Sequence, residues 1–326
     1  MRGGGRGRAG AGAALLAALL LLAGRAAGDL IYGDFRDTEA LRLLGACNQT
    51  AGRLRLTPSR PGQTGSAWYG AKQSVVGGFV TDFAFRLSLD ADQRHPGPCK
   101  LTEMDDALCS RRGGNGFAFV LQNAGEHSLG AGAESLGYGG IANALAVEFD
   151  TWHDASVRDP YENHVAVLTR GVHELRPDHG NHLGSTVKVP NLGDGASHLA
   201  RVEYFPTWRN ELALHPSFVA APFLGKLMQG LRRGADRGKW WQPAEPPAQH
   251  GLGVLRVFVD DLADPVLTVP VNLGAHLGLD QGRAWVGFTS ATGAAYQNHE
   301  IGNWTLSEVL SDPFMFEARH RAQPRD

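Results

Sequence analysis

The sequence predicts an all-β fold, most simply one large β-sandwich, on three observations. Glycine and proline are frequent, with 43 and 17 among 326 residues. Apolar and polar residues alternate in short runs, which is the period of half-buried strands. No long stretch has the apolar spacing of an amphipathic helix. A chain of about 300 residues also fits two ordinary domains, but this pattern favours a single one.

The first 28 residues have the layout of a secretory signal peptide. Arg2, Arg6 and Arg8 form a basic start, residues 13–23 are apolar, and small residues at 26–28 permit cleavage. The apolar run is too short for a comfortable membrane span, and no other stretch approaches one. We therefore expect a secreted, extracellular protein without a membrane span.

The charge balance argues against a nucleic-acid partner. The whole chain has 31 basic and 33 acidic residues, a net charge of -2. Removal of residues 1–28, with four arginines and no acids, leaves 27 basic residues and a net charge of -6. A nucleic-acid-binding domain would carry a basic excess.

The strands can be followed in order along the chain. Residues 30–56 read as short strands and loops, and residues 78–87 form a clear alternating strand. A buried strand follows at 114–121, entered through glycines. Two further strands are expected at 195–204 and 254–261, so the predicted elements are nearly all β.

Three cysteines and two sequons agree with an oxidising compartment. Cys99 and Cys109 lie in one long polar loop and are predicted to form a disulfide. Cys47 is then unpaired, although its pairing with either of them stays open. Asn48 and Asn303 begin acceptor sequons and are predicted glycosylation sites if exposed.

The stretch from Val147 to His164 carries the chemistry. Alternation places Val147 and Phe149 on one face of a strand, and Glu148 and Asp150 on the other. A second strand begins near His164 after a turn-rich loop. If the two strands pair as a hairpin, Glu148, Asp150 and His164 meet on one face.

Carboxylates gathered in this way repel unless a cation neutralises them. A set of carboxylates with an imidazole suits a divalent transition ion such as Mn²⁺; it comprises Glu148, Asp150, Asp159 and His164. An all-oxygen set suits Ca²⁺; it comprises Asp150, Asp154, Asp159 and the backbone carbonyl of Trp152. A solvated acidic strand face is the simpler reading of a lone E-x-D, but five side chains in one hairpin favour a metal site.

This hairpin resembles the metal-binding hairpin of the legume-type (L-type) lectins, position by position. Residues 65–70 and 78–87, and the closing stretches 265–273 and 282–301, are similar to other parts of the same domain. The resemblance implies a concanavalin A-like jelly-roll sandwich over residues 29–312, with a polar tail at 313–326. It further implies a lectin that binds glycans or glycoproteins, holds Ca²⁺ and Mn²⁺, and has no catalytic residues.

The resemblance also assigns a saccharide site. Asn115 stands where the family has an aspartate, and Asp154 stands where it has an asparagine. The exchanged pair can still donate and accept hydrogen bonds, although loss of sugar binding on a retained metal scaffold is the alternative. The other predicted contacts are the stacking ring of Trp152, a backbone N–H of Gly139 or Gly140, and the small residues Gly293, Ala294 and Ala295.

An insertion at 206–250 separates two strands that the family joins tightly. Residues 222–233 predict a short helix with one apolar face, begun by proline and followed by glycine. This insertion leaves open a second function, a protein-binding adaptor. A glycoside hydrolase using Glu148 and Asp150 is a weaker alternative, and a homo-oligomer also stays open.

Overall fold

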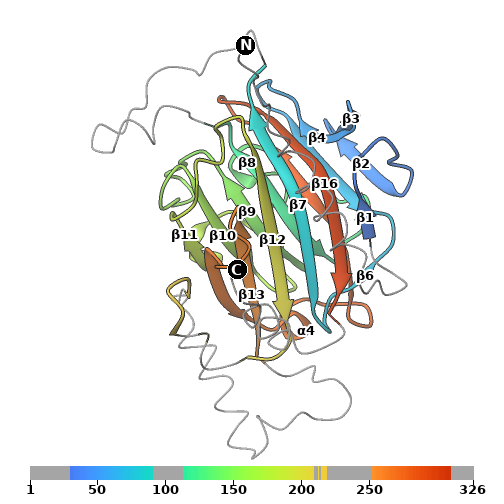
Figure 1. Cartoon of the computed structure of the whole chain (residues 1–326), viewed down its shortest axis with the longest axis vertical. Helices are drawn as coiled ribbons and strands as arrows, with labels where there is room; N and C mark the ends of the chain where they lie inside the picture. Colours follow the sequence, from blue (N-terminus) through green and yellow to red (C-terminus); the bar gives the residue numbers. More distant parts are fainter. Residues whose placement is uncertain (1–29, 91–112, 209–211, 213, 219–251, 310–326) are drawn as a thin grey trace, which may run out of the picture.

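Backbone hydrogen bonds join the strands into two antiparallel sheets. The alternating apolar side chains let these sheets pack face to face. The computed structural model describes residues 30–90, 113–208, 212, 214–218 and 252–309. Figure 1 shows one sheet lying over the other. The strands of the first sheet are β1 (Leu30–Tyr32), β3 (Asn48–Thr50), β4 (Arg53–Thr57), β7 (Phe79–Ser88), β12 (Ser197–Phe205), β13 (Gly253–Val259), β14 (Leu267–Val271) and β16 (Asn298–Glu308). Their order is β14-β13-β12-β7-β16-β4-β3, and β1 pairs with β16.

The second sheet carries the acidic hairpin. Its strands are β2 (Leu41–Gly45), β5 (Thr64–Tyr69), β6 (Gln73–Ser74), β8 (Gly116–Gln122), β9 (Ala144–Asp150), β10 (His164–Thr169), β11 (His182–Thr186) and β15 (Arg283–Ala291). Their order is β11-β10-β9-β8-β15-β5-β2, and β6 pairs with β15. The helical elements are short: η1 (Ala133–Ser135), η2 (His179–Asn181) and α4 (Leu273–His276). The predicted all-β sandwich is confirmed.

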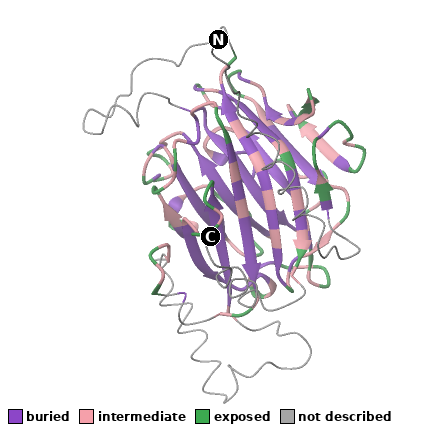
Figure 2. Ribbon diagram, in the orientation of Figure 1, coloured by how far each residue is buried: buried purple, intermediate pink, exposed green. Residues whose placement is uncertain are grey.

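The main core lies between the sheets, where the strands are buried on their inner faces (Figure 2). Phe83 is its centre, with ring centroids 5.0 Å from Phe288 and 5.7 Å from Phe149. A second apolar cluster covers the outer face of the second sheet, where Tyr138 and Leu136 pack on alanines of β8, β9 and β10. The second sheet is therefore buried on both faces, which explains its nearly continuous apolar strands.

Part of the predicted insertion packs on the edge of the first sheet. Leu212 joins Phe205 and Val254 in a small apolar cluster. The backbone N–H of Thr268 in β14 donates to Ser217 O at 2.9 Å, so the segment extends this edge. The predicted helix at 222–233 lies outside the described residues.

Other predictions can be placed only in part. Cys47 is a buried free thiol whose pKa is raised by burial to about 12, whereas Cys99 and Cys109 lie outside the described residues. Residues 1–28 and the tail at 313–326 lie outside them as well. Asn48 and Asn303 are both exposed, and their glycosylation stays a prediction. No helix in the described parts is long and apolar enough to cross a bilayer.

A buried histidine links the two sheets behind the acidic hairpin. His299 Nδ1 lies 2.7 Å from both Thr57 Oγ1 and Ser290 Oγ. Ser290 Oγ also donates to Gly116 O at 2.8 Å. Burial lowers the pKa of His299 to about 3, so its imidazole is neutral in the folded protein.

This buried imidazole predicts a loss of stability in acid. Between the unfolded pKa near 6.5 and the folded pKa of about 3, only the unfolded chain takes up the proton. Stability therefore falls as the pH drops through this window, by up to about 1.4 kcal/mol per pH unit for this one group. Urea unfolding at pH 4 to 7 should give a shallower pH slope for His299→Gln than for the wild type. The exposed-site variant His127→Gln is the control and should keep the wild-type slope; equal slopes for His299→Gln and wild type would contradict the assignment.

Candidate functional site

The acidic hairpin forms as the alternation predicts. Strands β9 and β10 pair antiparallel, with Asp150 opposite His164. Val147 and Phe149 point into the main core. Glu148 therefore lies on the opposite face, between Ala118 of β8 and Ala166 of β10. The small alanine side chains leave room above the sheet for groups that reach Glu148 from other segments.

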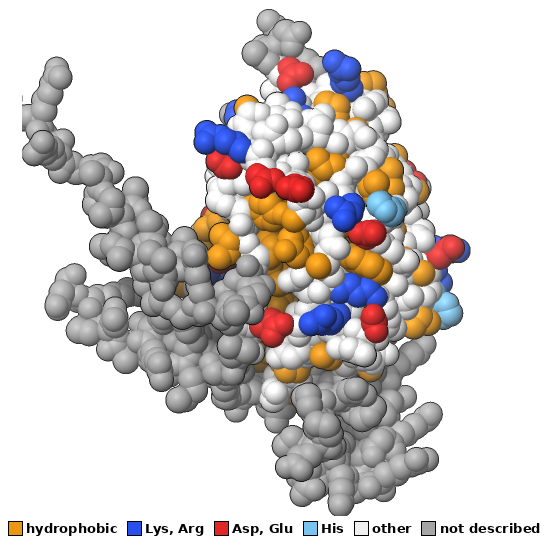
Figure 3. Space-filling model, turned by 90° about the vertical axis from the view of Figure 1, so that its right-hand side faces the viewer, with side chains coloured by type: hydrophobic (Ala, Val, Ile, Leu, Met, Phe, Trp, Pro, Cys, Tyr) orange, Lys and Arg blue, Asp and Glu red, His pale blue; other side chains and the backbone are white. Residues whose placement is uncertain are grey.

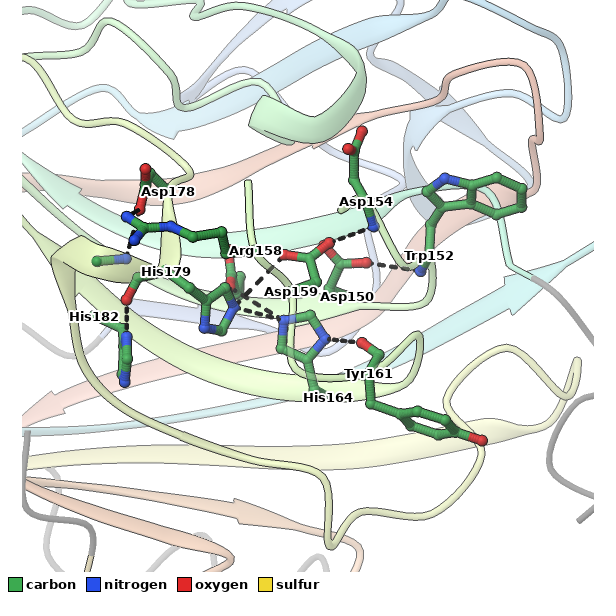
Figure 4. A network of polar contacts seen from close by, with 12 residues as sticks. Asp150, Trp152, Asp154, Arg158, Asp159, Tyr161, His164, Asp178, His179 and His182 are labelled. Carbon is green, nitrogen blue, oxygen red and sulfur yellow. Dashed lines mark hydrogen bonds and ion pairs between the residues drawn. The ribbon is translucent and has the colours of Figure 1, made fainter. Parts of the chain in front are cut away.

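Five donor side chains meet above this face. Two groups have all their donor atoms within 4.8 Å of one another, and they share one histidine. Their members are Glu148, His164 and His179 in one group, and Asp150, Asp159 and His164 in the other. Figure 4 shows the imidazoles of His164 and His179 directed at each other beside the carboxylate of Asp159. The structure brings four of the predicted hairpin side chains together, and His179 is an addition that sequence reasoning missed.

The electrostatics of this cluster fit a bound cation. Burial, followed by the charges of Asp159 and Glu148, raises the pKa of Asp150 well above its usual range. Burial also raises the pKa of Asp159. Burial alone would raise the pKa of Glu148 too, but hydrogen bonds and charge from His164 and His179 lower it to about 2. Burial and mutual repulsion thus disfavour ionisation of Asp150 and Asp159, and a divalent cation at this point would offset that repulsion.

Two tyrosines orient the donors from outside the cluster. The hydroxyl of Tyr138 donates to Glu148 Oε2 at 2.7 Å. His164 Nδ1 lies 2.8 Å from the carbonyl oxygen of Tyr161. Because only a protonated Nδ1 can donate to a carbonyl, Nδ1 of His164 carries a proton, and Nε2 is the ring nitrogen that faces the cluster. Metal-binding histidines commonly have this second hydrogen bond.

The predicted calcium loop wraps around the two central carboxylates through its backbone. The N–H of Trp152 donates to Asp150 Oδ1, and the N–H of Asp154 donates to Asp159 Oδ2, both at 2.7 Å. The carboxylate of Asp154 accepts from Ser156 N at 2.8 Å and points away from Asp150 and Asp159 (Figure 4). Asp154 therefore lies beside the cluster, but its carboxylate is not among the converging donors.

The predicted saccharide residues of two distant segments border the same loop. The carbonyl of Asn115 accepts from both Thr151 N, at 2.8 Å, and Thr151 Oγ1, at 2.9 Å. A Cβ at Gly293 would lie only 2.7 Å from Asn115 Oδ1. Asn115 is 4 % exposed and has a positive φ of 20°, a backbone region that asparagine tolerates better than most residues. Asn115 thus contacts the acidic hairpin through its backbone carbonyl and the closing loop through its side chain.

The remaining predicted contacts differ in exposure. Gly140 and Ala294 are exposed, whereas Gly139 and Ala295 are buried. The N–H of Gly139 donates to Ser135 O at 3.2 Å, and that of Gly140 donates to Leu175 O at 2.8 Å. A sugar oxygen would have to share either donor with a protein carbonyl. The half-buried ring of Trp152 points away from the carboxylates in Figure 4.

Comparisons with known proteins agree with this architecture. The model of the legume lectin domain family matches residues 28–205, more than half of the chain. A lectin from Bauhinia forficata in complex with GalNAc aligns with a TM-score of 0.54 and 16% identity, covering 86% of this chain and 97% of that chain. Lectin I-B4 from Griffonia simplicifolia, in a metal-free form, aligns with a TM-score of 0.55 and 17% identity, covering 86% and 99%. The exoplasmic/lumenal domain of VIP36, bound to Ca²⁺ and mannose, aligns with a TM-score of 0.51 and 13% identity, covering 84% of both chains.

Proposed function

The chain belongs to the legume lectin domain family, and we propose that it is a secreted lectin whose shallow saccharide site depends on Ca²⁺ and a transition-metal ion. The observation that carries this proposal is the junction of the acidic hairpin with Asn115. Thr151, which follows Asp150, donates from its N–H and its hydroxyl to the carbonyl oxygen of Asn115, and Gly116 lies opposite Asp150 in the sheet. The loop that begins after Asp150 is thus bonded to the residue that carries the predicted saccharide amide.

The cations would supply positive charge that neutralises the buried carboxylates. Glu148, Asp150, Asp159 and His164 are the proposed ligands of the transition ion. The proposed Ca²⁺ ligands are Asp150, Asp154, Asp159 and the carbonyl of Trp152. The backbone N–H groups of Trp152 and Asp154 donate to the two central carboxylates, so fixed carboxylates also fix the loop. If the loop is already ordered before the sugar binds, binding does not have to include the entropic cost of ordering it.

The proposed saccharide contacts are Asn115 and Asp154 as the exchanged polar pair, with the ring of Trp152 stacked on the sugar. Gly139, Gly140, Gly293, Ala294 and Ala295 would border the site. Two of the structurally similar proteins were solved with GalNAc and with Ca²⁺ and mannose, which supports a neutral sugar as ligand. We propose glycans or glycoproteins as the partners.

The other features of the chain agree with this role. The proposed lectin domain spans 29–312, after a signal peptide at 1–28. On the face seen in Figure 3, acidic and basic side chains are interspersed, with no basic patch for nucleic acid. Glycosidase chemistry needs two carboxylates facing each other across a cleft. Glu148 and Asp150 are both buried and lie among imidazole and carboxylate donors, which favours a ligand role over catalysis.

A glycan array tests the proposal. The mature chain should bind a defined set of glycans in Ca²⁺ and Mn²⁺ and lose that signal after EDTA treatment. Asn115→Ala should abolish the signal while metal binding remains. The control Gln49→Ala removes an exposed amide on β3, in the first sheet, and should bind as the wild type does. Bound metal with no glycan signal at all would contradict the saccharide proposal.

A further inference from the structure

His179 reaches the cluster from a segment outside the metal hairpin. It begins η2, between β10 and β11. The N–H of His179 donates to Val157 O at 2.9 Å. The preceding residue, Asp178, forms an ion pair with Arg158 and accepts from Gly180 N. The hairpin loop at 157–158 therefore holds this turn by both backbone and side chain, and places the imidazole of His179 over the donor face.

The donor separations are those of ligands around one ion. His179 Nε2 lies 3.1 Å from His164 Nε2, 3.5 Å from Glu148 Oε1 and 3.6 Å from Asp159 Oδ1. His164 Nε2 lies 3.4 Å from the same Glu148 oxygen. Bonds of about 2.0–2.2 Å to nitrogen and oxygen hold neighbouring ligands roughly 2.8–3.6 Å apart. A single small cation between Glu148, His164 and His179 would therefore contact all three side chains without rearrangement of the backbone, with Asp159 beside His179.

The surroundings of the two imidazoles also favour ligation. His164 and His179 are 0 % and 6 % exposed, and the Nε2 atoms of both approach the same carboxylate oxygen, Glu148 Oε1. A hydrogen bond between the imidazoles uses one Nε2 as donor and the other as acceptor, and it leaves the excess carboxylate charge in place. A cation at this point accepts lone pairs from both nitrogens and offsets that charge.

We propose that His179 is a direct ligand of the transition ion, so that the site has two imidazoles and selects Zn²⁺ over Mn²⁺. The inference rests on the proposed metal hairpin and names its metal. Imidazole nitrogens suit Zn²⁺, whereas carboxylate and water oxygens suit Mn²⁺. Each oxygen ligand replaced by imidazole therefore shifts the preference towards Zn²⁺.

The test combines spectroscopy with metal titration of the full chain, freed of metal by chelation. X-ray absorption at the zinc edge should count two imidazoles in the wild-type protein and one in His179→Gln. In chelator competition, His179→Gln should weaken Zn²⁺ binding by at least about 100-fold and Mn²⁺ binding by less than about 10-fold. His182→Gln removes an imidazole that lies tilted against the His179 ring, with centroids 5.1 Å apart, but is not a donor in either group; it should keep both affinities within about 3-fold.

Three outcomes would overturn the inference. One imidazole in the wild-type spectrum would mean that His179 makes a structural hydrogen bond only. Equal losses for Zn²⁺ and Mn²⁺ in His179→Gln, or equal losses in His182→Gln, would assign the effect to the fold of the turn. A two-imidazole zinc site without glycan binding would overturn the saccharide proposal alone, and this inference would stand.

Discussion

Replacement of Asp159 with asparagine is expected to abolish binding of both metal ions and, with them, saccharide binding. Asp159, like Asp150, belongs to both proposed ligand sets. Asparagine keeps an oxygen that accepts from Asp154 N, so the loop contact survives while the charge is lost. Calorimetric titration should show each ion bound at least about 100-fold more weakly than in the wild type.

Asp280→Asn is the matched control for Asp159→Asn. Asp280 pairs with Lys72 at an exposed site and is not a donor in either group, so both ions should bind nearly as in the wild type. Without metal, Asp159→Asn should be at least as stable as the wild type at neutral pH. The reason is that burial raises the pKa of Asp159, so its ionised form destabilises the metal-free fold. Wild-type affinity for both ions in Asp159→Asn would contradict the shared-ligand assignment.

Replacement of Phe83 with alanine should cause the largest loss of stability. Its ring lies edge-on to Phe117, Phe149 and Phe288 at the centre of the sandwich. Phe83 is fully buried, and a phenylalanine-to-alanine change in a core typically costs about 3–5 kcal/mol. Urea unfolding of the metal-free protein should show this decrease in the free energy of unfolding.

The control for Phe83→Ala is Val172→Ala, at an exposed apolar position, which should change stability by less than about 0.5 kcal/mol. Two of the rings that touch Phe83 lie next to predicted site residues. Phe149 precedes Asp150 on β9, and Phe117 on β8 comes two residues after Asn115. A loss below about 1 kcal/mol for Phe83→Ala would show that the aromatic centre can collapse around the cavity.

The hairpin could be predicted because the residue pattern that specifies it lies within one short stretch of sequence. Alternation in β9 assigns Phe149 to the core and Glu148 to the opposite face, whatever the rest of the fold does. If the next strand pairs with β9 as a hairpin, His164 meets Asp150 on the same face, and the structure has this pairing. The family resemblance added the roles of these residues, and the family match bears out the resemblance itself.

His179 and Tyr138 could not be predicted because their contacts depend on tertiary structure. His179 follows His164 by fifteen residues and belongs to a separate turn, and no periodicity links the two. Tyr138 was hidden in a glycine-rich run whose glycines were interpreted as sugar contacts. In the structure, Gly137 has a positive φ of 76°, and a Cβ there would lie 2.9 Å from Ser290 O. That close approach seats the next residue, Tyr138, over Glu148.

The orientation of the Asp154 side chain is a further feature that could not be predicted from the sequence. Sequence reasoning assigned its carboxylate to Ca²⁺ and to a sugar, yet this carboxylate accepts from Ser156 N two residues later. Aspartate favours this local turn contact wherever the backbone allows it. This local hydrogen bond competes with binding of a metal ion or a sugar by the Asp154 carboxylate. The exchange of residue types therefore matters more at position 154 than at position 115.

The metal content of the wild-type protein tests the central claim most directly. Elemental analysis after dialysis against trace Ca²⁺ and a mixture of transition ions should give two divalent ions per chain, one Ca²⁺ and one transition ion. We expect the transition ion to be Zn²⁺ if His179 is a ligand. A chain that retains no divalent ion would contradict the account, because the buried carboxylates of Asp150 and Asp159 would then have to be neutralised by protons.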